Sequence, residues 1–315
     1  MTIPATIGDR LRLPLISAPM FRVSGPDLVV AACKHGVIGA FPTANCRSVD
    51  ELDRWLRDIS AALTPADAPF CANLIMRRAD MLQHLDCLLR HRVEVVITSV
   101  GSPEEVIGPL HDIGCMVLAD VASLRHAHKA ADAGADGLIL LTAGAGGQTG
   151  WLNGFAFVRA VRRFFDGMLV MAGGMSDGQA LWAARALGCD LAYMGTKFIA
   201  THESMADERY RQMLVTSEVD DVLLSRAFTG MDTNMLRPSI TAAGLDPEDI
   251  PTAVGQEGAA ALYGGSNPGP HRWKDIWSSG HAVSGVDSVC SVAELVEQTR
   301  REYEAARKAS YEAAI

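Results

Sequence analysis

The feature that most constrains this chain is a regular alternation of short apolar runs with amphipathic helical stretches. Eight apolar runs occur, and each is bounded by polar or turn-forming residues. Runs of this length and density are typical of parallel strands that are buried on both faces. The predicted strands are Leu13–Ala18, Val37–Phe41, Phe70–Ile75, Val93–Thr98, Cys115–Ala119, Gly137–Leu141, Met168–Met171 and Leu191–Met194.

Helices are predicted between these strands, for example over Pro26–His35 and Val49–Leu63. Eight strand–helix units are the number in a (β/α)₈ TIM barrel, whose working face is built from the loops that follow the strands. An open doubly wound sheet is the alternative, but it usually carries one glycine-rich loop after its first strand. Here the glycine-rich loops follow the sixth, seventh and eighth strands. The sequence therefore favours a TIM barrel over residues 1–216.

The chain beyond residue 216 does not continue this rhythm. A short strand is predicted over Leu223–Phe228 and helices over Gly255–Tyr263 and Val292–Lys308. We therefore expect residues 217–315 to form a helical extension that covers the barrel mouth. Within it, Gly264–Pro270 is a glycine- and proline-rich loop, which is interpreted either as a lid or hinge or as an ordinary surface loop.

Charge and composition exclude several classes of function. The formal net charge of −9 argues against a general affinity for nucleic acid or for an anionic membrane. No apolar run approaches ~20 residues and the amino terminus lacks a signal-peptide pattern, so a cytoplasmic protein is expected. The seven cysteines are odd in number, scattered and never in a CxxC pair. They predict reduced core residues, not disulfides or zinc ligands.

The sixth predicted strand leads into a loop that is almost free of side chains. Glycines allow a backbone to approach a flat or anionic ligand closely, and they permit positive φ. Gln148 is the only sizeable polar side chain in this loop, so we expect the chemistry to lie near it. Trp151 and Asn153 follow and either line a substrate pocket or serve as a packing residue and a helix cap. The loop glycines are Gly144, Gly146, Gly147 and Gly150.

The seventh and eighth strands also end in glycines. Gly173 and Gly174 follow one strand, and Gly195 and Thr196 follow the other. Exposed backbone N–H groups with a hydroxyl beside them form an anion nest, at the place where barrels commonly bind phosphate. The alternative is that Gly173 and Gly174 only turn the chain. The pair of loops predicts a ligand that carries a phosphate.

These motifs together resemble the nitronate monooxygenase family, formerly called 2-nitropropane dioxygenases. The resemblance covers about residues 10 to 240 and rests on APM, GVIGAFPT, NLI, AGAGGQTG, AGGM and MGTKF in that order. Members of that family are FMN-dependent TIM barrels with an added helical domain. The resemblance implies an isoalloxazine ring against Ala18, Pro19, Met20, Ala143, Gly146 and Gly147, with Asn73 at its edge. It also implies that Gly173, Gly174, Gly195 and Thr196 hold the FMN phosphate.

Two departures from the family pattern bear on catalysis. Family members that oxidise nitronates typically carry AGGHxG, whereas this chain has Gln148 at the histidine position. A carboxamide donates and accepts hydrogen bonds but does not transfer protons near neutral pH. Asp120 stands where some relatives have a lysine, and is either a catalytic carboxylate or a helix N-cap. His281, in WSSGHAV, is either a second catalytic candidate or an ordinary hydrogen-bonded histidine.

Three functions follow as hypotheses for a small-molecule substrate. The first is an FMN-dependent oxidase or monooxygenase of the nitronate type. The second is an FMN-dependent reductase or dehydrogenase of an enoyl or acyl thioester, or of a quinone, with NADH or NADPH as one candidate electron partner. The third is a flavin-free phosphate-binding barrel, such as an isomerase or aldolase, for which Lys197 is the nearest Schiff-base lysine. No metal cluster is evident in the sequence.

Overall fold

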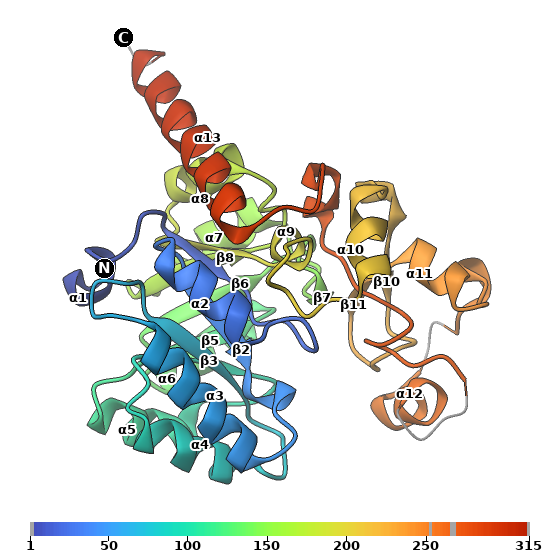
Figure 1. Ribbon diagram of the computed structural model, residues 1–315, viewed down its shortest axis with the longest axis horizontal. Coiled ribbons are helices and arrows are strands. Elements are labelled where there is room, and N and C mark those ends of the chain that lie inside the picture. Colours follow the sequence, from blue (N-terminus) through green and yellow to red (C-terminus); the bar gives the residue numbers. More distant parts are fainter. Residues whose placement is uncertain (1–2, 252–253, 265–268, 314–315) are drawn as a thin grey trace.

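The computed structural model describes residues 3–251, 254–264 and 269–313, and its centre is a closed barrel of eight parallel strands (Figure 1). The last barrel strand pairs with the first, with Met194 opposite Ser17, so the sheet has no open edge. The prediction of a TIM barrel is confirmed, and the doubly wound sheet is excluded. The barrel strands are β1 (Leu15–Ser17), β2 (Ile38–Pro42), β3 (Phe70–Ile75), β4 (Val95–Ser99), β5 (Met116–Val121), β6 (Gly137–Leu141), β8 (Met168–Ala172) and β9 (Leu191–Met194).

The strands are apolar on both sides because each side meets a different core. Side chains such as Ile16, Ile97 and Ile139 fill the barrel interior. Their neighbours along the strands, such as Val96 and Leu138, pack outward against the helices. Residues that point to either face of a strand are therefore apolar, which is why the sequence shows continuous apolar runs.

Helices surround the barrel between successive strands. Ser48 and Ser123 each cap a helix by accepting a hydrogen bond from a backbone N–H three residues on. The surrounding helices are α2 (Pro26–Lys34), α3 (Val49–Ala62), α4 (Met81–Arg90), α5 (Glu104–Asp112), α6 (Leu124–Asp132), α7 (Gly154–Val161) and α8 (Gly178–Leu187).

The carboxyl-terminal helix α13 (Val292–Glu312) lies against α8 and α2 on the outside of the barrel, and its far end projects from the body (Figure 1). Residues 217–315 were expected to cover the barrel mouth, but α13 lies outside the barrel and does not cover it. The contact with α8 is close because a Cβ on Gly178 would lie 2.2 Å from the backbone nitrogen of Tyr303. The Gly178 N–H also donates to Glu302 at 2.9 Å. This long-range packing places α13 in the gap between the helices of the seventh and first units.

A second sheet of three antiparallel strands lies outside the barrel, in the order β10–β11–β7. The strand β10 (Val222–Ser225) matches a predicted strand, whereas β11 (Thr233–Leu236) and β7 (Gly147–Gln148) were not expected. The expected helical extension therefore contains strands. The division of the chain at residue 216 stays a prediction, and residues 265–268 of the expected lid lie outside the described residues.

The remaining helices are short, and most lie between β9 and α13. They are α1 (Ala5–Gly8), α9 (Thr196–Ile199), α10 (Glu208–Val215), α11 (Arg237–Ala242) and α12 (Gln256–Tyr263), with single 3₁₀ turns at Thr43–Asn45, Val219–Asp221, Pro247–Asp249 and His281–Gly285.

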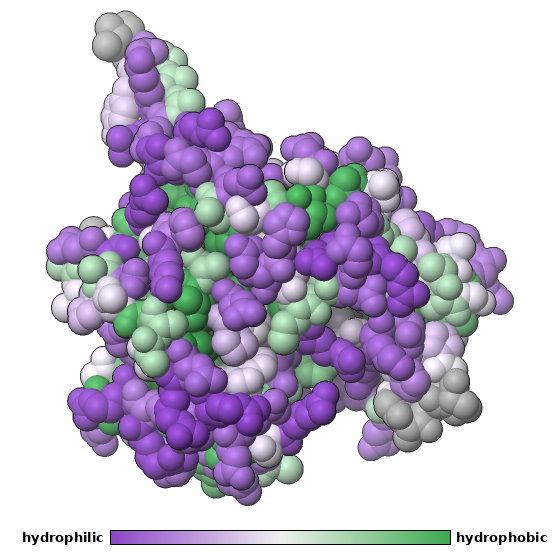
Figure 2. Space-filling model, in the orientation of Figure 1, coloured by the Kyte–Doolittle hydropathy of each residue, from purple (hydrophilic) through white to green (hydrophobic). Residues whose placement is uncertain are grey.

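The surface and the cysteines agree with the composition. The face in Figure 2 is mostly hydrophilic, with small apolar patches between hydrophilic regions. Within the described residues, no helix combines the length and the apolar character that crossing a bilayer requires. All seven cysteine thiols are free, and all except Cys290 are buried.

Candidate active site

A cavity of about 790 Å³ opens at the end of the barrel where the strands finish. This volume lies within the ~300–1,000 Å³ that is usual for ligand pockets. The cavity brings together most of the residues that the sequence singled out. Those on its lining are Ala18, Pro19, Met20, Asn73, Asp120, Gly146, Gly147, Gln148, Gly173, Gly174, Gly195 and Thr196.

The glycine loop after β6 is fixed in place by Asn234 of β11. The Asn234 side chain is 1% exposed, and its Nδ2 donates to the carbonyl oxygens of Ala143 at 2.8 Å and Ala145 at 2.7 Å. Pairing of β11 with β7 sets Thr233 opposite Gln148. The loop therefore takes its shape from a segment almost ninety residues further along the chain. Sequence reasoning missed Asn234 because no local pattern marks it.

Two of the four glycines of this loop are required by packing within the protein and not by a ligand. A Cβ on Gly146 would lie 2.7 Å from the backbone nitrogen of Gly280, and one on Gly150 would lie 2.5 Å from the Leu141 carbonyl. Gly147 differs, since its φ is +67° and a Cβ there would meet nothing closer than 4.0 Å. The expectation that these glycines make room for a ligand is therefore wrong at Gly146 and Gly150, where the protein's own backbone occupies that space.

Gln148 lies half-buried on the cavity wall, at the end of β7. Its carboxamide forms no hydrogen bond with another described residue. A free amide on a cavity wall is able both to donate to and to accept from a ligand. Gln148 is therefore available to orient a polar group of a bound molecule.

The loops after β8 and β9 form one side of the cavity. Gly173 and Gly174 have φ angles of +110° and +72°, which side chains rarely adopt. A Cβ on Gly174 would meet nothing within 4 Å, so conformation and not space requires glycine there. The Thr196 hydroxyl accepts from the Gly280 N–H at 3.0 Å, which leaves its own proton for a ligand. These groups fit a phosphate, which needs several donors from one side.

Two further strand ends contribute polar groups to the cavity. Asn73 of β3 is buried, and its Nδ2 donates to the Ser99 hydroxyl of β4 at 3.1 Å. Asn45, in the turn after β2, donates to the Met20 carbonyl of the loop after β1 at 3.1 Å and accepts from the Arg22 N–H at 2.8 Å. These bonds hold the Ala18–Met20 backbone at the cavity wall. Ser99 and Asn45 were not identified from the sequence.

Asp120 lies on β5 and is not a helix cap, because Ser123 caps the following helix. Its Oδ1 atom is buried without a hydrogen-bond partner among the described residues. Burial raises the pKa of the Asp120 carboxyl to about 7. Tyr193 of β9 lines the same cavity, and burial raises the pKa of its hydroxyl well above the ordinary value. Asp120 is thus a carboxyl that titrates near neutral pH inside the cavity.

The cavity lining also carries aromatic rings and cations. Tyr210 and Trp277 stack with their ring centroids 4.9 Å apart. Arg22, Arg272 and Lys274 also line the cavity, and none of the three forms an ion pair with a described carboxylate. Arg272 Nη1 donates to the Phe228 carbonyl at 2.7 Å, and burial lowers the pKa of its guanidinium. These cations on the cavity lining therefore favour an anionic ligand.

Several predicted residues lie elsewhere. His281 is exposed and, with Lys197, lines a separate cavity of about 290 Å³, so neither faces the main cavity. Ala143 is not on the cavity lining and instead holds the loop through its carbonyl. Asn153 caps α7 by accepting from the Phe155 N–H at 3.0 Å. The side chain of Trp151 is 74% exposed and is neither a pocket nor a packing residue.

Comparison with known proteins shows the family of this chain. A family model described as nitronate monooxygenase matches residues 79–302. A protein from Rhodococcus jostii (strain RHA1), named (3aS,4S,5R,7aS)-5-hydroxy-7a-methyl-1-oxo-octahydro-1H-indene-4-carboxyl-CoA dehydrogenase, is 30% identical over 227 residues. The match covers 72% of this chain but only 63% of that relative. A nitronate monooxygenase from Paraburkholderia phytofirmans is 27% identical over 92% of both chains.

A solved structure supports the fold. Nitroalkane oxidase from Streptomyces ansochromogenes superposes with a TM-score of 0.80 and 24% identity, over 96% of this chain and 99% of that one. Because the family model spans most of the barrel, this protein belongs to the nitronate monooxygenase family, whose members are flavin-dependent oxidoreductases.

Proposed function

We propose that this protein is an FMN-dependent oxidoreductase in which Asp120, and not a histidine, transfers protons for a small anionic substrate. Bound FMN would supply the redox chemistry. Its phosphate would be held by the loops at Gly174, Gly195 and Thr196, and Asn73 would hydrogen-bond the ring edge. The positive φ of Gly174 and the polar groups around it support this placement of the phosphate. The free thiols support a reducing compartment, the cytoplasm.

The position of Asp120 carries the proposal. A proton-transfer group works best when its pKa is close to the working pH, and the Asp120 carboxyl has a pKa of about 7. Gln148, at the position where the resemblance implies a histidine, is limited to hydrogen bonding with a substrate oxygen. Asp120 would therefore transfer the proton and Gln148 would hydrogen-bond the substrate, whereas a histidine is able to do both.

The cofactor assignment is tested by binding. FMN, FAD and riboflavin are titrated into flavin-free protein and followed by quenching of flavin fluorescence. We expect FMN to bind most tightly and riboflavin at least ~100-fold more weakly, because two or more charge-assisted hydrogen bonds to phosphate are lost. Equal affinity for FMN and riboflavin would contradict the phosphate assignment.

Two substrate classes suit the cavity, and the cations on its lining help to distinguish them. A nitronate, the substrate class in the family name, is a small anion. An acyl thioester of coenzyme A is the second candidate, because Arg22, Arg272 and Lys274 would match a phosphate-rich group at the cavity mouth. The name of the Rhodococcus jostii relative also contains a coenzyme A ester.

Anaerobic mixing separates these classes. Loss of flavin absorbance with propionate 3-nitronate would support the nitronate reading. Loss with NADH or NADPH followed by recovery with an enoyl thioester would support the second.

An arginine variant tests whether the mouth binds phosphate. Arg272→Gln should raise the KM for a coenzyme A thioester at least ~10-fold, because one charge-assisted contact is lost. It should leave the KM for the same acyl group on pantetheine unchanged, since pantetheine lacks the nucleotide. Arg237→Gln is the matched control, because Arg237 pairs with Glu248 and does not line the cavity. Equal effects on both thioesters would contradict phosphate binding by Arg272.

A further inference from the structure

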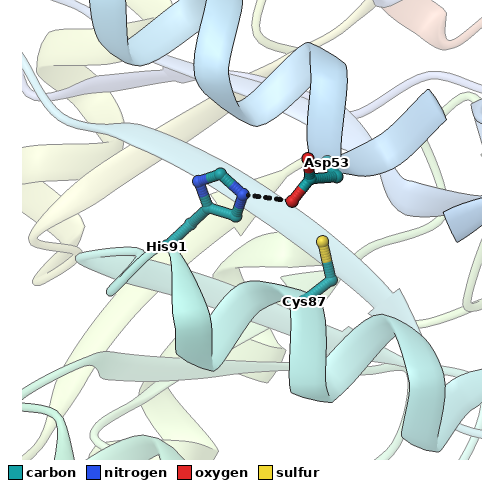
Figure 3. Close-up of side chains that lie close together, drawn as sticks. All are labelled: Asp53, Cys87 and His91. Atoms are coloured by element: carbon teal, nitrogen blue, oxygen red, sulfur yellow. Dashed lines mark hydrogen bonds and ion pairs between the residues drawn. The ribbon is translucent and has the colours of Figure 1, made fainter. Parts of the chain in front are cut away.

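A cluster of three metal-binding residue types lies between α3 and α4, away from the main cavity. Asp53 of α3 faces Cys87 of α4 and His91, the residue that directly follows α4 (Figure 3). One carboxylate oxygen, the Cys87 sulfur and one His91 ring nitrogen all lie within 4.8 Å of one another. None of the three lines the cavity that is proposed to bind FMN.

The backbone fixes this arrangement. His91 lies four residues after Cys87, and its N–H donates to the Cys87 carbonyl at 3.2 Å, so both side chains leave the same face of the helix. Asp53 is held opposite by His91, whose Nε2 lies 2.8 Å from Oδ1. The thiol is fully buried, whereas His91 and Asp53 are partly exposed. A metal ion would thus reach the cluster from the solvent side.

We propose that Asp53, Cys87 and His91 bind one Zn²⁺ ion, with water as the fourth ligand. Thiolate, imidazole and carboxylate are all zinc ligands, at about 2.0–2.3 Å in a tetrahedral arrangement. That geometry separates neighbouring ligand atoms by roughly 3.4 Å. The partly exposed side chains of Asp53 and His91 would therefore have to shift by about 1 Å around the buried Cys87 thiol. The bound ion would cross-link α3 to α4.

The surrounding charges are compatible with a cation. Asp53 also pairs with Arg57 and Arg90, at 3.1 Å each. On metal binding Arg90 keeps its pair with Asp86, at 3.2 Å, and the exposed Arg57 returns to solvent. Exposed ion pairs of this kind contribute little to stability, so their loss opposes zinc only weakly. A thiolate and a carboxylate together neutralise the two positive charges of the ion.

Cobalt substitution tests the site in the full-length protein, stripped with a chelator and kept reduced. Co²⁺ bound to a thiolate gives a near-ultraviolet charge-transfer band, which we expect in the unaltered protein at one ion per chain. Cys87→Ser should abolish the band. His91→Ala and Asp53→Asn should each weaken Zn²⁺ binding at least ~100-fold. Mutation of a residue that only hydrogen-bonds a metal ligand already lowers metal affinity by ~10–100-fold.

Matched controls are available in the same chain. His111 and Asp136 form another histidine–carboxylate pair at 2.9 Å, and they belong to no metal-competent group of the described residues. His111→Ala and Cys290→Ser should leave Co²⁺ binding unchanged. Zn²⁺ should raise the Tm of the unaltered protein and of both controls but not of His91→Ala. Absence of the thiolate band, its survival in Cys87→Ser, or an equal Tm rise in His91→Ala would overturn the proposal. None of these readouts depends on flavin.

Discussion

Replacement of Asp120 by asparagine should make the protein more stable above neutral pH. The native carboxyl has a pKa of about 7, because it is buried, whereas an unfolded aspartate titrates near ~3.9. Below pH ~3.9 the residue is protonated in both states and has no effect. As the pH rises from ~4 to ~7 the unfolded chain loses its proton first, so folding becomes progressively less favourable. Above pH ~7 the penalty is constant.

The size of the effect follows from the same two pKa values. A separation of about 3 pH units corresponds to a full penalty of at most about 4 kcal/mol. Between pH 5 and pH 8 the stability difference between Asp120→Asn and the unaltered protein should widen by about 2–3 kcal/mol. Urea unfolding at several pH values, at equal flavin content, measures this difference directly.

A second cavity carboxylate supplies the control. Asp207 also lines the cavity, but hydrogen bonds from Arg209 lower the pKa of its carboxyl. The stabilisation from the ionised Asp207 carboxyl is lost only at acidic pH. From pH 5 to pH 8, the free energy of unfolding of Asp207→Asn should therefore run parallel to that of the unaltered protein. Asparagine also keeps the helix cap that Asp207 forms. A parallel curve for Asp120→Asn would refute the assigned pKa and the proton-transfer role that rests on it.

The other predictions concern the glycine loop. Asn234→Ala should cost about 2–4 kcal/mol in urea unfolding, because one buried and one partly buried carbonyl lose their donor, and it should weaken FMN binding; an unchanged flavin affinity would argue that Asn234 does not shape the site. Gly146→Ala should lower Tm more than Gly147→Ala, since only the first would place a Cβ against the Gly280 backbone, and the reverse order would contradict the packing. Gln148→His should introduce or raise nitronate turnover; if it does neither in a flavin-loaded protein, residue 148 does not limit that reaction.

Much of the candidate site was predictable because barrel geometry converts strand order into proximity. Once eight strands are assigned, the residues after their carboxyl ends must meet at one face, whatever their separation in sequence. Asp120, Gln148 and Gly174 were predicted from strand ends, whereas Asn73 was expected from the family resemblance. His281 was misplaced because it lies outside the barrel strands, where no such rule applies.

The residues that were missed are held by long-range contacts. Asn234 comes from the region after β9, whose course the local pattern does not define. The strand β11 is only four residues long, and its partner β7 is two residues within a glycine loop. Neither is long enough to show a periodicity, so their pairing has no signal in the sequence.

The sequence by itself determined the barrel, the face that carries the site and the residue types available there, because these depend on strand length, apolar density and the positions of glycines. Only the tertiary structure decided which groups are desolvated and which are paired. Asp120 illustrates the difference: its place at a strand end is local information, but its neutral-range pKa results from burial by strands far apart in the chain. The gap between α3 and α4 is a second case, since Asp53 meets Cys87 and His91 only when the helices pack.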